Sequence, residues 1–278
     1  MNQAGLFAGL SLTQPRILGI INVTPDSFSD GGEAYAPEDA LKRGKEMLAA
    51  GADILDVGGE STRPGAKPIS ADDEISRVLP VIEGLAGMGA LVSIDTRRAP
   101  VMHSAIKAGA VIINDVSALT GDKDSLVVVA NSGLPVILMH MQGDPGTMQD
   151  HPQYDDAAKD VYHYLADRIQ ACEAAGIDRG RIAVDPGIGF GKTLAHNLDI
   201  LGRLSLYNDL GVTVMLGASR KSFIGKISAG DDPKDRLGGS IAACVAAYRQ
   251  GVRLFRVHDV AETRQALAVF QAINEAGG

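Results

Sequence analysis

The chain has 278 residues and a net charge of −8, and 45% of its residues are hydrophobic but only 4% aromatic, with no Trp. The acidic balance argues against a general polyanion binder, and the few aromatic residues argue against a nucleic-acid reader with stacking platforms. There is no charged segment before an apolar one at the N-terminus, and no apolar run approaches the roughly 18 residues that cross a bilayer. We therefore expect a cytoplasmic protein without signal peptide or membrane span.

Residues 1–14 indicate a short N-terminal arm, and residues 15–278 form a single domain of repeated strand and helix patterns. Apolar, β-type runs recur at 16–21, 53–57, 91–94, 111–113, 136–139, 182–184, 213–216 and 252–257. Helical patterns alternate with them: 36–50, the segment that Ser70 opens with Asp73 as a capping pair, 100–109, 124–131, 155–175, 197–209, 235–250 and 261–275.

A glycine precedes seven of these strands, which suits the left-handed conformation that ends a helix. They are Gly51, Gly89, Gly109, Gly133, Gly176, Gly211 and Gly251. The strands are apolar throughout rather than alternating, so both faces are buried, as in a parallel sheet covered by helices. Eight such units predict an α/β protein with a single (β/α)8 TIM barrel. A doubly wound open sheet is the alternative, disfavoured because no G-x-G-x-x-G follows the first strand.

Cys172 and Cys244 lie in alanine-rich helical patterns without metal-ligand spacing. This indicates two buried thiols rather than a disulfide or a zinc site.

Polar residues stand at or near the carboxyl ends of all eight strands, where a barrel gathers its active site. They are Asn22, Asp56, Asp95, Asn114, His140, Asp185, Ser219 and His258. Any one could simply cap the next helix or bond to a loop. Polar groups at the ends of apolar strands are costly unless paired or used, so eight together predict a functional mouth.

The segments around this mouth are of two kinds. Residues 23–35 and 58–68 are long and rich in Gly, Pro, Ser and Thr, which favours mobile lids over ordinary surface loops. Cations come from Arg63, Arg220, Lys221, Arg256 and His258. With carboxylates and amides on one part of the rim and cations on another, we expect a ligand that joins a hydrogen-bonding heterocycle to a phosphate-type anion.

The glycine-rich stretch 182–193, IAVDPGIGFGKT, is close to a phosphate-binding P-loop but carries Pro186 where that motif needs glycine. Proline has no N–H to offer a phosphate. The stretch is therefore expected to present Asp185 at a strand end, with Lys192 facing solvent.

Eight segments resemble those of the bacterial dihydropteroate synthases, a family of pterin-binding TIM barrels. In chain order they are GIINVTPDSFSDGG (19–32), DVGGESTRPGA (56–66), SIDT (93–96), NDVSAL (114–119), MHMQGDPGTMQ (139–149), DPGIGFGKT (185–193), GASRKSFIG (217–225) and RVHDV (256–260).

The resemblance implies a transferase of folate biosynthesis that condenses 6-hydroxymethyl-7,8-dihydropterin diphosphate with 4-aminobenzoate, giving 7,8-dihydropteroate and diphosphate. It implies Mg2+ as cofactor, small-molecule substrates, a homodimer and sensitivity to sulfonamides. The catalytic residues it implies are Asn22, also the Mg2+ ligand, Arg63, Lys221, Arg256 and His258. Asp95, Asn114, Asp185 and Lys221 would hold the pterin, with Met139 as apolar contact and Ser219 also at the substrate. The aminobenzoate side would comprise Phe28, Thr62, Arg63, Pro64, Phe190 and Ser222.

Two other functions fit a pterin-binding barrel. One is a methyltransferase domain working with a corrinoid partner, which would not need SRK (219–221) or RVHDV (256–260) for a diphosphate. The other is a non-catalytic pterin-binding paralogue, which the intact lid segments disfavour.

Overall fold

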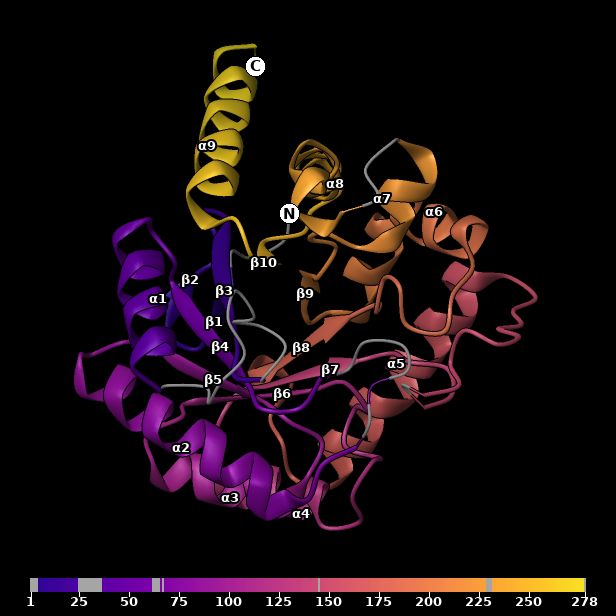
Figure 1. The fold of residues 1–278 in the computed structure, drawn as a ribbon. Coiled ribbons are helices and arrows are strands. Elements are labelled where there is room, and N and C mark those ends of the chain that lie inside the picture. Colours follow the sequence, from indigo (N-terminus) through magenta and orange to yellow (C-terminus); the bar gives the residue numbers. More distant parts are fainter. Residues whose placement is uncertain are drawn as a thin grey trace.

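The computed structural model describes residues 5–24, 37–61, 66, 68–144, 146–228 and 232–277. Eight parallel strands close into a barrel in the order β10-β3-β4-β5-β6-β7-β8-β9 (Figure 1). Their bounds are β3 Arg16–Asn22, β4 Ile54–Gly58, β5 Val92–Asp95, β6 Ile112–Asp115, β7 Val136–Met139, β8 Ile182–Asp185, β9 Thr213–Leu216 and β10 Leu254–Val257. The predicted barrel is confirmed, and the open sheet is excluded because β10 pairs with β3.

Helices surround the strands (Figure 1). They are α1 Pro37–Ala49, α2 Ala71–Gly87, α3 Ala99–Lys107, α4 Ser125–Ser132, α5 Ala157–Ala174, α6 Leu194–Gly202, α7 Ser222–Ile227, α8 Leu237–Arg249 and α9 Val260–Gly277. Ser70 caps α2 as predicted, since its hydroxyl accepts from the Asp73 N–H at 3.1 Å. None of the described helices is long and apolar enough to cross a membrane.

Three helical segments differ from the sequence-based expectation. The segment 197–209 was expected as one helix but is divided into α6 and the 3-10 helix η3 (Leu204–Leu210). Ahead of α8, residues Pro233–Arg236 form another 3-10 helix, η4. Helix α7 was not predicted, because its six residues are too few to show an amphipathic period.

The predicted glycine turns are confirmed by backbone geometry. All seven glycines that precede strands have positive φ, from 69° at Gly211 to 108° at Gly109. The two cysteines, Cys172 and Cys244, are buried free thiols, also as expected.

The N-terminal arm has a structural role that its sequence did not reveal. Strands β1 (Leu6–Phe7) and β2 (Leu10–Ser11) form an antiparallel hairpin. Phe7 is 1% exposed and joins a cluster that includes the first residues of three barrel strands, Ile54, Ile112 and Leu254. The hairpin therefore closes the floor of the barrel, opposite the mouth at which the predicted site residues gather.

Candidate active site

The strand register brings most of the predicted residues to one end of the barrel. Gly58 pairs with Asp95, Asp95 with Asn114, and Met139 with Asp185. Asp56 lies deeper, because β4 continues for two residues beyond it, to Gly58, which pairs with Asn22. The mouth is thus layered, with Asp56 beneath the other polar residues.

Arg256 joins the deep layer to the upper one. Its Nε donates to Asp56 Oδ2 and its Nη2 to Asp95 Oδ2, each at 2.6 Å. The expected separation of carboxylates and cations on different parts of the rim is wrong, because this cation lies between two of the carboxylates. Burial raises the pKa of Asp95 to about 7, although the Arg256 guanidinium acts in the opposite direction.

Asn114 is oriented by the same carboxylate. Its Nδ2 donates to Asp56 Oδ2 at 3.1 Å, which leaves its Oδ1 as an acceptor without a hydrogen-bond partner among the described residues. Asp56 is fully buried, and its Oδ1 has no hydrogen-bond partner among the described residues. Asp56 thereby orients two of the predicted ligand-binding side chains, Asn114 and Arg256.

Asp185 is 3% exposed at the end of β8. Its Oδ1 accepts from the Gly187 N–H at 2.7 Å. Burial raises the pKa of Asp185, while this hydrogen bond and the nearby Lys221, Arg256 and Lys192 act to lower it. Its Oδ2 makes no hydrogen bond within the described part of the chain and remains an acceptor for a ligand.

Lys221 and Phe190 meet beside Asp185. The Lys221 ammonium lies 3.9 Å from the centroid of the Phe190 ring, a cation–π contact. Burial, followed by repulsion from Arg256, lowers the pKa of Lys221 to about 8, against attraction by Asp185 and Asp95. Met139 and Phe190 belong to a small buried apolar cluster with Val116 and Met148, two residues that the sequence analysis did not single out because apolar side chains carry no distinctive signal there.

His258 and Ser219 form a pair across β9 and β10. The Ser219 hydroxyl accepts from the His258 backbone N–H at 3.2 Å and lies 3.0 Å from its Nδ1. Burial and the cations Arg256 and Arg220 lower the pKa of His258 to about 3. The prediction of a cationic His258 is therefore wrong for the protein without a bound ligand. With the Ser219 hydroxyl donating to Nδ1, the neutral ring keeps Nε2–H as a donor.

Arg220 is not a free cation of the mouth as predicted. Its Nε donates to Asp259 Oδ2 at 3.0 Å, and a second ion-pair contact joins the same two side chains. Its backbone is left-handed, with φ of 58°. The salt bridge and the turn together fix the segment that delivers Lys221.

Lys192 is also placed differently from the expectation. It is 2% exposed, not solvent-facing, and its Nζ lies 2.9 Å from the Phe190 carbonyl oxygen and 3.0 Å from His140 Nδ1. The prediction failed because a lysine at the end of a glycine-rich loop has no local pattern that indicates burial.

The glycines of this loop serve packing rather than phosphate binding. A Cβ on Gly187 would lie 1.9 Å from the His140 carbonyl oxygen, and one on Gly191 would lie 2.3 Å from that of Gln142. The Gly189 N–H donates to Asn197 Oδ1 at 2.7 Å and is not available to an anion. The expectation that this stretch is not a phosphate-binding P-loop agrees with these contacts.

The remaining predicted residues are less enclosed or lie outside the described residues. Asn22 is half-buried at the end of β3, and its side chain has no hydrogen-bond partner within the described ranges. Ser222 is exposed as the first residue of α7. Predictions for Phe28, Thr62, Arg63 and Pro64 fall outside the described residues, as do 25–35 of the first lid segment and 62–65 and 67 of the second.

Asn22 offers an amide oxygen that could hold Mg2+ at this mouth. Among the described residues no group of three or more His, Cys, Asp or Glu side chains could hold a metal ion. Mg2+ in phosphate-transfer sites commonly takes only one or two protein oxygens and completes its shell with water and substrate phosphates. The unpaired amide of Asn22 fits that mode of binding.

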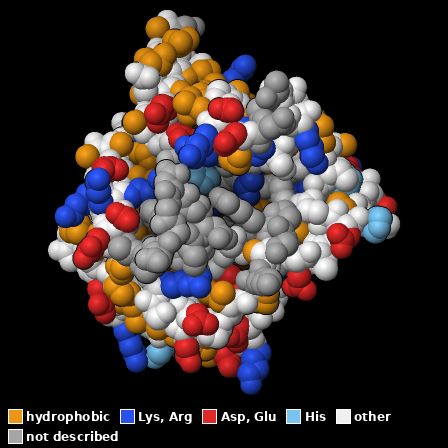
Figure 2. Space-filling view, in the orientation of Figure 1, with side chains coloured by type: hydrophobic (Ala, Val, Ile, Leu, Met, Phe, Trp, Pro, Cys, Tyr) orange, Lys and Arg blue, Asp and Glu red, His pale blue; other side chains and the backbone are white. Residues whose placement is uncertain are grey.

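Basic side chains border the middle of the face that Figure 2 presents. The mouth therefore offers acceptor oxygens to a ligand's hydrogen-bond donors and cations to a ligand's negative charge, with Arg256 placed among the carboxylates.

Comparison with known proteins agrees with this geometry. Residues 18–258 match the family model described as pterin binding enzyme. The chain therefore belongs to the family of pterin binding enzymes.

The dihydropteroate synthase of Escherichia coli strain K12 is 47% identical over 264 residues, covering 95% of this chain and 93% of that one. A solved structure of Xanthomonas albilineans dihydropteroate synthase with 4-aminobenzoic acid superposes with a TM-score of 0.90 at 47% identity, covering 96% of each chain. A Yersinia pestis dihydropteroate synthase with a sulfonamide drug complex has a TM-score of 0.90 at 44% identity, again covering 96% of each. Within its family the chain belongs with the dihydropteroate synthases.

Proposed function

We propose that this enzyme condenses 6-hydroxymethyl-7,8-dihydropterin diphosphate with 4-aminobenzoate to form 7,8-dihydropteroate and diphosphate. Three acceptor oxygens at the mouth, Asp95 Oδ1, Asn114 Oδ1 and Asp185 Oδ2, have no hydrogen-bond partner among the described residues, while their companion atoms are held by Arg256, Asp56 and Gly187. Such acceptors suit the 2-amino and ring N–H donors of a pterin.

The pterin would lie between these acceptors and Lys221. Orienting the ring before it binds reduces the entropy lost on binding, and each acceptor is already held by a neighbouring group. Lys221, whose pKa is lowered to about 8, would act as a donor to the acceptor atoms of the ring. The apolar side chain of Met139, 5% exposed, would contact the ring plane.

The diphosphate would lie toward Arg256 and His258. In its neutral form His258 would donate through Nε2–H, since Ser219 occupies the other ring nitrogen. Binding of an anion would also favour the protonated imidazole, because a nearby negative charge raises the pKa of His258. Asn22 would hold Mg2+, which when bound would neutralise charge on the leaving diphosphate.

The aminobenzoate side would include Phe190, together with the predicted Phe28, Thr62, Arg63 and Pro64 of the lids and Ser222 at the start of α7. The Xanthomonas and Yersinia structures hold 4-aminobenzoic acid and a sulfonamide in enzymes 47% and 44% identical to this chain. We therefore propose that sulfonamides inhibit this enzyme at the aminobenzoate side.

The chemistry requires little acid–base assistance from the protein. An arylamine is neutral near pH 7 and needs no strong base to become a nucleophile. The difficult step is loss of diphosphate from the pterin methylene, through a cation that the pterin stabilises. Arg256 and His258 would stabilise the negative charge that develops on the leaving group, and lid closure would exclude water that could capture the cation.

The activity assay is direct. The purified enzyme, incubated with both substrates and Mg2+, should release diphosphate and form dihydropteroate in equal amounts. Folded protein that yields no product would refute the proposed function. Diphosphate release that continues without aminobenzoate would instead indicate hydrolysis of the pterin substrate.

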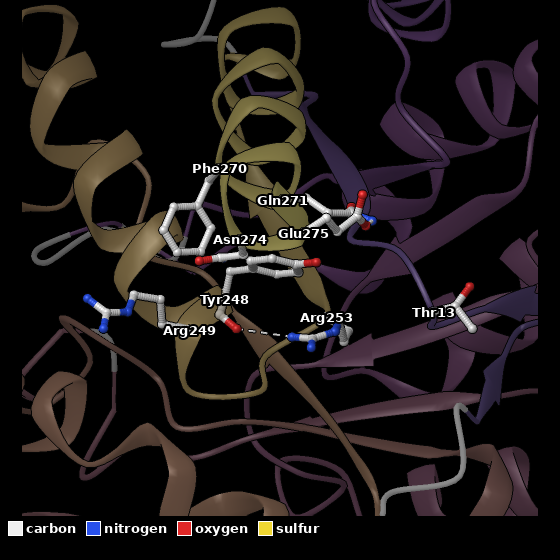
Figure 3. Close-up of a pocket in the computed structure, with 8 residues that line it drawn as sticks. All are labelled: Thr13, Tyr248, Arg249, Arg253, Phe270, Gln271, Asn274 and Glu275. Atoms are coloured by element: carbon white, nitrogen blue, oxygen red, sulfur yellow. Dashed lines mark hydrogen bonds between the residues drawn. The ribbon is translucent and has the colours of Figure 1, made fainter. Parts of the chain in front are cut away.

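We also propose a homodimer formed through α8 and α9. Helix α9 projects beyond the body of the barrel (Figure 1), and Val269 and Ile273 on it are 54% and 63% exposed. A hollow of about 390 Å³ lies between the turn after α8 and this helix, as Figure 3 shows. Within it the Tyr248 and Phe270 rings meet edge to face, with their centroids 5.9 Å apart. The Arg253 Cζ lies 4.4 Å from the centroid of the Tyr248 ring, a cation–π contact.

The oligomeric state can be measured by analytical ultracentrifugation. We expect wild-type protein to sediment as a dimer and Ile273→Glu as a monomer, because a buried charge opposes an apolar interface. Val127→Glu, at a position 59% exposed on α4, is the matched control and should remain dimeric. A wild-type monomer at micromolar concentration would contradict the proposal.

A further inference from the structure

We propose that Lys192 and His140 are positioning residues for the proposed reaction: their buried contact clamps the β8–α6 loop (residues 186–193) to the end of β7 and so fixes Phe190 on the aminobenzoate side. The inference rests on the proposed function. It assigns a role to a residue pair that none of the substrate contacts proposed above involves.

The first observation is burial with directed hydrogen bonds. Lys192 is 2% exposed and His140 is 6% exposed. The Lys192 ammonium reaches His140 Nδ1 at 3.0 Å, the His140 carbonyl oxygen at 3.4 Å and the Phe190 carbonyl oxygen at 2.9 Å. Burial lowers the pKa of Lys192 to about 7, against attraction by Asp185. In its protonated form the amine has only donors, so His140 Nδ1 is then the acceptor. One side chain thereby ties β7 to the backbone of Phe190.

The second observation is the close packing that the clamp maintains. Gly187 has φ of 70°, and its α-carbon lies so near the His140 carbonyl that a Cβ would be 1.9 Å away. The loop is held from its outer side as well. Gln149 Nε2 donates to the Gly189 carbonyl at 2.7 Å, and the Tyr154 hydroxyl donates to that of Gly191 at 2.8 Å.

The third observation links the clamp to the site. The carbonyl that Lys192 holds belongs to Phe190, whose ring lies under the Lys221 ammonium at 3.9 Å. Lys192 is also near enough to Asp185 to act on its charge. Burial lowers the pKa of His140 to about 3, which agrees with a neutral imidazole that accepts from lysine.

The placement of a lysine here is costly, which argues for a role beyond filling space. A buried ammonium must recover the free energy of its lost hydration through its partners. If the loop required only a polar residue at its end, a lysine whose ammonium stays in solvent would meet that need without losing its hydration. The three acceptors gathered around Nζ therefore indicate that the loop's position is what Lys192 stabilises.

The test compares steady-state kinetics of Lys192→Met, His140→Leu, the double variant, and Lys107→Met, an exposed lysine on α3 that serves as control. Because Phe190 loses its anchor, we expect the KM for aminobenzoate to rise roughly 10-fold in Lys192→Met, with the KM for pterin diphosphate changed less than about threefold. His140→Asn, whose side-chain oxygen can accept near the position of Nδ1, should recover most of the loss in His140→Leu.

The double variant gives a second criterion. If one contact joins the two residues, the double variant should be about as impaired as the worse single variant rather than showing the product of both effects. Thermal stability is measured alongside. A purely structural contact would lower the melting temperature and the active fraction while leaving both KM values unchanged, and that pattern would overturn the proposal.

Amide hydrogen exchange of residues 186–193 provides a readout independent of turnover. We expect faster exchange in Lys192→Met and His140→Leu but not in Lys107→Met, because the Gly187 and Gly189 N–H groups donate to Asp185 and Asn197, and these bonds depend on the loop's position. Unchanged exchange would overturn the clamp. Wild-type protein without synthase activity would refute the proposed function, and the exchange experiment would still decide the clamp. Should Lys192→Met fail to fold, His140→Leu and His140→Asn test the same contact.

Discussion

Replacement of Asp185 by asparagine should weaken pterin binding more than any neutral change of similar size elsewhere. The Gly187 N–H already occupies Oδ1 at 2.7 Å. In the variant this N–H requires the amide oxygen, so the NH2 group must take the place of Oδ2. The pterin donors would then meet a donor instead of a charged acceptor.

The expected loss follows from the value of a hydrogen bond to a charged group. Such a bond contributes about 1.5–3 kcal/mol, which corresponds to a roughly 10- to 150-fold weaker Kd for the pterin. Because a donor also faces the ligand donors, we expect the upper part of that range. Aminobenzoate capture should change far less, since Asp185 lies on the pterin side.

Isothermal titration calorimetry with pterin diphosphate measures this directly. Asp167→Asn, on the exposed face of α5, makes the same chemical change without touching the mouth and should bind as wild type does. Melting temperatures of both variants confirm folding. A pterin affinity within threefold of wild type for folded Asp185→Asn would refute the assigned role.

Three further predictions address the lids, the metal and pH. Arg63→Ala should reduce kcat/KM while leaving pterin affinity within a few-fold, and a large loss of pterin affinity in calorimetry would contradict its assignment to a lid. Removal of Mg2+ with a chelator should abolish turnover, which excess Mg2+ restores; Asn22→Ala should raise the Mg2+ concentration needed for half-maximal activity, and an unchanged requirement would argue against Asn22 as ligand. The pKa of His140 is lowered from 6.5 to about 3 by burial. Between these two pH values the imidazole is protonated in the unfolded chain but neutral in the folded one. The free energy of unfolding is therefore undiminished by His140 above about pH 6.5. It declines toward pH 3, with a slope that approaches roughly 1.4 kcal/mol per pH unit. His140→Asn should lose that part of the slope in urea unfolding at pH 4 to 7, and identical slopes would contradict it.

The fold could be predicted because its signals are local. A continuously apolar strand, a helix and a glycine with positive φ each depend on a few neighbouring residues, and their eightfold repetition leaves few architectures. The predicted strand ends at Asp95, Asn114 and Asp185 meet at one mouth for the same reason.

Other features depend on contacts between distant residues and left no mark in the sequence. Lys192 is buried because His140, 52 residues earlier, offers it an acceptor. The pKa of His258 is lowered first by burial and then by the nearby Arg256 and Arg220, which are distant in the sequence or give no local sign of this contact. Phe7 fills the floor of the barrel only once eight strands have closed around it. Burial and pKa are properties of the assembled surroundings, and one segment does not define them.

The salt bridges of Arg256 also have a consequence for the order in which the protein becomes active during synthesis. Its partners Asp56 and Asp95 precede it by 200 and 161 residues. Until β10 leaves the ribosome, Asp56 and Asp95 lack the counter-ion that they have in the complete barrel, and β3 lacks its partner strand on that side. Partly made chains cannot bind the substrate in the proposed manner, and their need for protection from aggregation is greatest at this stage. The proposed site is therefore completed only by the last strand of the barrel.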